Sequence, residues 1–155
     1  MKLVKNLVVT DIDTLHKVSE EVNMDDVATK GYVRDTLLQT YKKLNGALQG
    51  MAAIQVSLPW RAILLRYKKG EEPIVIFNPK VICSFGRKTS NEGCLSEGDD
   101  RWIVRRPLLM RVEYYTFDNE RIVEWLPYKK ARIFKHEVDH LNGILLQDIG
   151  KKVSN

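Results

Sequence analysis

Apolar residues recur with helical spacing over residues 24–45. The apolar positions of this segment are Val27, Val33, Leu37, Leu38, Tyr41 and Leu44. A repeat of this kind places the apolar side chains on one face of an α-helix. Asp25 and Asp26 suit the first turn of such a helix, and Gly46 suits its end. The pattern therefore predicts an amphipathic helix near the start of the chain.

The middle of the chain changes to short runs rich in β-branched and aromatic residues. These runs span 61–67, 73–78, 80–85, 108–117 and 121–126. Residues 68–72 (KKGEE) join the first two runs, and Asp118-Asn119-Glu120 joins the last two. Short polar connections that contain Gly or Asn are typical of β-hairpins. The pattern predicts several strands that pair mostly antiparallel.

Helical spacing returns over residues 128–142. Ala131, Phe134, Val138 and Leu141 form its apolar face, and Gly143 follows as a natural helix end. The resulting order, helix, strands, helix, favours an α+β fold with an antiparallel-rich sheet over alternating βαβ units. With 155 residues, the chain is expected to form a single domain over 1–155.

Composition narrows the class of protein. The chain is 44% hydrophobic and 29% charged, values typical of soluble globular proteins. It contains no apolar run long enough for a transmembrane helix and no recognisable signal peptide, so no membrane partner is expected. The net charge of +5 is spread along the chain, so a solvated surface is expected and no DNA partner. Two cysteines without an export signal indicate a reducing, cytoplasmic compartment.

The segment HEVDH, residues 136–140, carries the strongest chemical signal. Residues four apart lie on one face of a helix, so His136 and His140 can bind one cation. Glu137 projects beside that cation, where a carboxylate can take a proton from water. Surface or packing roles for these three residues are the alternative, but the spacing is rare by chance. The segment predicts the two-histidine half of a metal site with a catalytic base.

A catalytic metal site needs a third protein ligand. The chain has no glutamate after Glu137, and Leu146 stands where a downstream third histidine would be. The third ligand must therefore come from upstream: Cys94, Cys83, His16 or a carboxylate. Cys94 lies in a polar stretch, 91–98, whereas Cys83 lies in an apolar run and is expected to be a small buried hydrophobic residue. A thiolate with two imidazoles would suit Zn²⁺ or Fe²⁺ and not Mg²⁺ or Ca²⁺.

Three motifs together resemble the peptide deformylases, which remove the formyl group from the N-terminal formyl-methionine of new polypeptides. LQGMAAIQ at 48–55, EGCLS at 92–96 and HEVDH at 136–140 occur in the order found in that family. The resemblance implies a small α+β fold with antiparallel-rich sheets around a central helix that carries HEVDH. It also implies one divalent ion bound by Cys94, His136 and His140, with Fe²⁺ as the usual ion and Zn²⁺, Ni²⁺ or Co²⁺ as substitutes.

The same resemblance assigns roles to further residues. Glu137 would be the general acid and base, and Gln55 with the backbone N–H of Leu95 would bind the oxyanion. Gly50 would lie in a strand that pairs with the substrate, an N-formyl-methionyl peptide. Formate would be released. A transient association with the ribosome is a further expectation, because nascent chains emerge there.

The chain also departs from the family pattern. Leu48 replaces a glycine and Gln49 an apolar residue beside the substrate strand, and Glu97 follows EGCLS where an apolar residue is usual. These three residues are therefore expected to contact the substrate and to alter its preference. Lys129, Lys130 and Arg132 interrupt an apolar stretch before HEVDH. The departures indicate a compact, divergent member, of a kind that a phage or an organelle could carry, working in a bacterial cytoplasm or an organelle matrix.

Other roles remain open from the sequence. Asp139 is expected to be structural, paired with Arg106 or another arginine. Glu92 either orients a ligand or lies on the surface, and Arg101 either touches the substrate or braces the sheet. Two alternative functions stand beside deformylation: a metal-dependent amidase or peptidase of other specificity, and an inactive relative that binds nascent chains.

Overall fold

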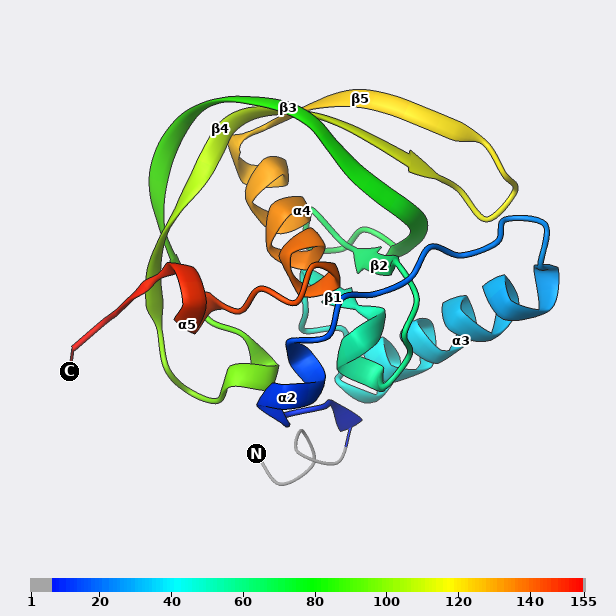
Figure 1. Cartoon of the computed structure of the whole chain (residues 1–155), viewed down its shortest axis with the longest axis horizontal. Helices are drawn as coiled ribbons and strands as arrows, with labels where there is room; N and C mark the ends of the chain where they lie inside the picture. The colour runs from blue at the N-terminus through cyan, green and yellow to red at the C-terminus, as the bar shows by residue number, and fades with distance from the viewer. Residues whose placement is uncertain (1–6, 155) are drawn as a thin grey trace.

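The apolar runs in the middle of the chain form one six-stranded antiparallel sheet (Figure 1). The computed structural model describes residues 7–154. The strands are β1 (Gly50–Ala52), β2 (Ala62–Leu65), β3 (Ile74–Glu92), β4 (Trp102–Tyr115), β5 (Arg121–Pro127) and β6 (Lys151–Lys152). They follow the order β1-β2-β3-β4-β5, and β6 pairs with β4. The predicted α+β class with antiparallel pairing is confirmed.

Two longer helices flank this sheet. The helices are α2 (Ile12–Leu15), α3 (Val27–Lys43), α4 (Tyr128–Leu141) and α5 (Leu146–Ile149), with 3₁₀ turns η1 (Ala53–Val56) and η2 (Leu95–Glu97). The N-cap of α3 is Asp26, whose carboxylate accepts a hydrogen bond from the Thr29 N–H. Gly143 follows α4 with a φ of +70°, which ends that helix. In the described part of the chain, no helix has the length and apolar character to cross a bilayer.

Two details of the predicted strands are corrected. The runs 73–78 and 80–85 belong to the single long strand β3, because register shifts between Phe77 and Lys80 absorb the intervening proline. The strand predicted at 108–117 begins earlier, at Trp102. Cys83, expected to be buried, is only half-buried, and residues 84–89 that follow it on β3 are exposed.

The sheet is packed between the two longer helices. Along β2, Ile63 and Leu65 belong to the apolar cluster that includes Phe134 and Val138 of α4. Ala62 and Leu64, the alternate residues of the same strand, pack in the cluster that includes Val33 and Leu37 of α3. Because successive side chains of a strand point to opposite faces, the buried strand β2 packs against α4 on one face of the sheet and α3 on the other. In Figure 1, β3, β4 and β5 curve over α4, which places the HEVDH helix inside the fold.

Candidate active site and metal centre

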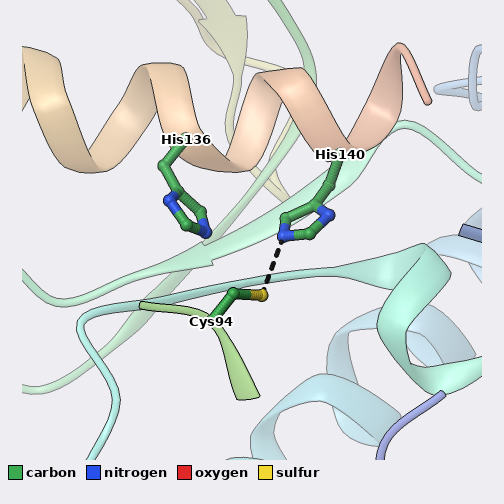
Figure 2. Close-up of side chains that lie close together, drawn as sticks. All are labelled: Cys94, His136 and His140. Atoms are coloured by element: carbon green, nitrogen blue, oxygen red, sulfur yellow. Dashed lines mark hydrogen bonds between the residues drawn. The ribbon is translucent and has the colours of Figure 1, made fainter. Parts of the chain in front are cut away.

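Cys94, His136 and His140 come together from two segments that are distant in the chain. Cys94 lies directly before η2, and the two histidines project from the same face of α4 (Figure 2). The Cys94 Sγ lies 3.3 Å from the His140 Nε2, and one donor atom from each of the three residues lies within 4.8 Å of the others. Of the four upstream candidates for a third ligand, the structure brings Cys94 to the histidines.

This donor set fits a divalent transition metal. Zinc–sulfur and zinc–nitrogen bonds of about 2.3 and 2.1 Å at tetrahedral angles separate the donors by about 3.5 Å, close to the spacing found here. Sulfur with two imidazole nitrogens suits Zn²⁺ or Fe²⁺. Three protein donors also leave a position for a reacting molecule. The group can therefore hold a catalytic ion.

A buried charge network orients His136. The His136 Nδ1 lies 2.9 Å from the Glu92 Oε1, so the Nε2 is left to face Cys94. Arg106 donates two hydrogen bonds to Glu92, each 2.9 Å long, and one of 2.7 Å to Asp139. Burial alone would raise the pKa of Glu92, but the hydrogen bonds from His136 and Arg106 outweigh it and lower that pKa to about 2. The expected pairing of Asp139 with Arg106 is confirmed.

Replacing Arg106 by leucine is expected to destabilise the fold by about 3–5 kcal/mol, because it leaves the buried carboxylates of Glu92 and Asp139 without their partner. Arg106 is 2% exposed. Urea denaturation followed by circular dichroism measures the loss. The matched control is Arg105→Leu, the exposed neighbour on β4, which should change stability by less than about 0.5 kcal/mol. Equal effects of the two substitutions would contradict the role given to Arg106.

Glu137 lies beside the Cys/His group in a buried position. Its side chain is 5% exposed, and its Oε2 has no hydrogen-bond partner within the described part of the chain. Burial raises the pKa of Glu137 to about 7. A carboxyl group in such a setting can both accept and release a proton near neutral pH.

Gly50 of β1 provides the space that Glu137 occupies. A Cβ added at Gly50 would lie 2.7 Å from the Glu137 Oε1 and 2.8 Å from its Cγ. Any larger residue at position 50 must push the carboxylate away. The absence of a side chain on Gly50 of β1 therefore allows Glu137 its observed position.

Gly50→Ala is expected to lower kcat/KM for the reaction that the motif resemblance implies, deformylation of formyl-Met-Ala-Ser, by about 10- to 100-fold, because displacing a catalytic group by about an ångström has effects of this size. The rate of formate release measures this loss. The control is Gly31→Ala in α3, where an added Cβ meets nothing within 4 Å. Gly50→Ala activity equal to that of Gly31→Ala would show that Glu137 does not depend on the contact.

Gln55 is held with its amide facing the thiol. Its Oε1 accepts a 2.9 Å hydrogen bond from the Ala52 N–H, and its Nε2 donates to the Ser96 Oγ at 3.0 Å. The same Nε2 lies 3.6 Å from the Cys94 Sγ. The sequence did not single out Ser96, although it closes the EGCLS motif. Its hydroxyl helps to hold the Gln55 amide in place.

A cavity of about 200 Å³ opens beside this group. Leu48, Gln49, Gly50, Gln55, Leu95 and Glu137 all line it, together with Cys94 and His136. Each of these residues was singled out from the sequence. The structure therefore places the predicted base, the residues of the predicted oxyanion donors and three of the four predicted substrate-contacting residues around one space.

Glu97 does not line this cavity, which corrects the expectation that it contacts the substrate. Its two carboxylate oxygens accept hydrogen bonds of 3.1 Å from the backbone N–H groups of Leu146 and Gln147 at the start of α5. The side chain fastens η2 to α5. His16, a candidate ligand, instead lies 3.0 Å from the carboxylate of Asp148.

Comparison with known proteins decides the family. The family model described as Polypeptide deformylase matches residues 4–155. This chain belongs to the polypeptide deformylase family. The peptide deformylase of Rhizobium meliloti (strain 1021) is 35% identical over 154 residues, covering 97% of this chain and 87% of the relative. Peptide deformylase 2 of Clostridium perfringens (strain 13 / Type A) is 34% identical over 152 residues, with 97% and 95% covered.

Solved deformylase structures share the fold. The Thermotoga maritima enzyme superimposes with a TM-score of 0.81 at 28% identity, covering 92% of this chain and 95% of that one. The Acinetobacter baumannii enzyme with Met-Ala-Ser bound gives a TM-score of 0.81 at 30% identity, with 92% and 96% covered. Peptide deformylases are metallohydrolases that remove the N-formyl group from nascent peptides, and the chain has this function.

Proposed function

We propose that this deformylase acts on N-formyl-methionyl peptides with one divalent ion held by Cys94, His136 and His140, in a single catalytic domain over residues 1–155. Fe²⁺ is the proposed physiological ion, with Zn²⁺, Ni²⁺ or Co²⁺ as substitutes. One observation carries the proposal: the Cys94 Sγ lies 3.3 Å from the His140 Nε2, beside a buried carboxylate that faces the cavity.

The substrate peptide is proposed to align along β1. This strand stands at the end of the sheet order and pairs only with β2 among the described strands. An extended peptide can add to such an edge through backbone hydrogen bonds. Leu48, Gln49 and Gly50 would then contact the first residues of the peptide. The Acinetobacter baumannii structure, which carries Met-Ala-Ser, is consistent with a short peptide in this family.

Glu137 and Gln55 carry the proposed proton transfer and charge stabilisation. A bound divalent ion supplies Lewis acidity, which lowers the pKa of water and polarises a carbonyl group. Glu137 takes the proton of the attacking water and later passes it to the amine that leaves. The Gln55 Nε2 and the backbone N–H of Leu95 donate hydrogen bonds to the oxygen on which negative charge collects. The formyl carbon carries a hydrogen atom where the acetyl carbon carries a methyl group. A tight site therefore admits a formyl group and excludes an acetyl group.

The enzyme is proposed to work in a reducing compartment, either a bacterial cytoplasm or an organelle matrix. A thiolate must remain reduced to bind the ion, and both cysteines have free thiols. Transient association with the ribosome would bring the enzyme to its substrate.

Formate release tests the proposal directly. The protein is prepared anaerobically with Fe²⁺ and supplied with formyl-Met-Ala-Ser or acetyl-Met-Ala-Ser. Formate is expected from the first peptide, and no cleavage of the second. An absence of formate, or equal cleavage of the acetyl peptide, would favour an amidase of other specificity or an inactive binding protein.

A further inference from the structure

A second cavity, of about 420 Å³, adjoins the catalytic one. The two share Gln49, Gly93, Arg132 and His136 as wall residues. Because His136 belongs to the Cys/His group, the second cavity begins directly beside the reacting centre. A side chain near the formyl end of a bound peptide can therefore enter it.

The two cavities differ in chemistry. The catalytic cavity includes the apolar side chains of Leu48, Met51, Leu95 and Ile133. Apart from Gly93, the second cavity is lined only by side chains that carry a polar group, among them Thr89, Ser90, Asn91 and Tyr128. We name the second cavity the polar annex. A methionine side chain, with its thioether, would be stabilised little by such a lining. A charged or hydrogen-bonding side chain would find hydrogen-bond partners there.

Arg132 of α4 brings one positive charge to the annex. Its Nη2 donates a 3.2 Å hydrogen bond to the Gln49 Oε1, a neutral partner. Arg132 is half-buried, and it forms no ion pair with another residue in the described part of the chain. It is also one of the basic residues that interrupt the apolar stretch before HEVDH. Its guanidinium therefore remains available to an anion in the annex.

Arg101 brings a second charge to the annex wall. Its Nε and Nη2 donate to the side-chain and backbone oxygens of Asn91, at 3.0 and 2.9 Å. Its Nη1 lies 2.8 Å from the point that a Cβ on Gly93 would occupy, so the guanidinium rests against the turn before Cys94. Within residues 7–154, Arg101 also has no carboxylate partner.

The one carboxylate in the annex wall does not offset these charges. Glu92 is 2% exposed and is already paired with Arg106 and His136. The annex therefore combines two unpaired guanidinium groups with neutral hydrogen-bonding groups. Guanidinium groups bind carboxylates with charge-assisted, often bidentate hydrogen bonds.

We infer that the polar annex binds the side-chain carboxylate of the residue that follows formyl-methionine, with Arg132 as the residue that determines this specificity. The inference rests on the proposed function and narrows its preferred substrates to formyl-methionyl peptides with an acidic second residue. Glutamine serves as the neutral control because it has the shape of glutamate without its charge.

The experiment compares kcat/KM of the Fe²⁺ enzyme for formyl-Met-Glu-Ser against formyl-Met-Gln-Ser. A glutamate preference of about fivefold or more is expected, the equivalent of about 1 kcal/mol for a partly exposed ion pair. The preference should fall as salt is added, because the contact is between charges.

Arg132→Gln is expected to reduce the glutamate-to-glutamine ratio to about one, and Arg101→Gln to reduce it in part. The control is Arg87→Gln, which removes the same charge from an exposed position on β3 outside both cavities and should leave the ratio unchanged. Formate release with a ratio of one in the parent enzyme would overturn this inference alone. A ratio that persists in Arg132→Gln would also overturn it, and no formate from any formyl peptide would overturn the proposed function with it.

Discussion

Replacing Glu137 by glutamine is expected to lower kcat/KM for formyl-Met-Ala-Ser by about 100- to 10,000-fold, the range attributed to a positioned acid–base group. This loss is expected because of where the Glu137 carboxylate lies. Glu137 is 5% exposed, faces the catalytic cavity and has an Oε2 without a hydrogen-bond partner among the described residues. An amide of the same shape fills this space but cannot carry the proton from water to the leaving amine.

Glutamine at position 137 should leave the fold and the bound metal intact, since the ligands are its neighbours and not Glu137 itself. Metal content per chain and the thermal midpoint should therefore match those of the parent. Formate release under single-turnover conditions measures the chemical step separately from product release. A Glu137→Gln enzyme that keeps more than about a tenth of the parent rate would exclude Glu137 as the acid–base group.

Replacing Cys94 by alanine is expected to remove the metal and reduce formate release to background. Two imidazoles remain on α4, but a catalytic site of this type uses three protein ligands. Metal content after dialysis against metal-free buffer measures the first effect, and the formate assay measures the second. The matched control is Cys83→Ala, which removes the other thiol from a half-buried position on β3 and should retain both metal and activity. One metal per chain in Cys94→Ala would contradict the assigned ligand set.

Chelation of the metal should also lower the thermal midpoint of the parent protein. The ion would join η2 to α4 through residues 46 apart in the chain. Metal at about 100 times its dissociation constant stabilises the fold by about 2.7 kcal/mol, which corresponds to roughly 5–10 °C for a chain of this size. The Cys94→Ala protein should show no such shift. An equal shift in Cys94→Ala would mean that the stabilising ion binds elsewhere.

Much of the secondary structure follows from local patterns. The apolar period of residues 128–142 predicts α4, and Gly143 predicts its end, since both depend on contacts within a few residues. The continuity of β3 through Pro79 is different. A proline usually ends a run, and only the pairing of β3 with β2 and β4 carries the strand through its bulges to Glu92.

In the candidate site, too, some features follow from local helix geometry and others only from tertiary packing. Helical geometry by itself places His136 and His140 on one face of α4, and their spacing with Glu137 already indicates metal-dependent hydrolysis. Residue chemistry alone left several upstream ligands open. Packing of the β3–η2 turn against α4 brings Cys94 to the histidines, and the resemblance of three motifs anticipated that choice.

Glu97 and Arg132 lie in places that their positions along the chain do not indicate. Glu97 follows the EGCLS motif directly, yet its carboxylate turns to the start of α5, because the unpaired N–H groups there attract an anion. Arg132 lies in a different segment, yet it reaches the wall shared by both cavities. The sequence by itself determined the helix, the strands and the chemistry of each motif, since these depend on neighbouring residues. Only the tertiary structure decided which side chains meet, because those contacts join segments that the chain keeps far apart.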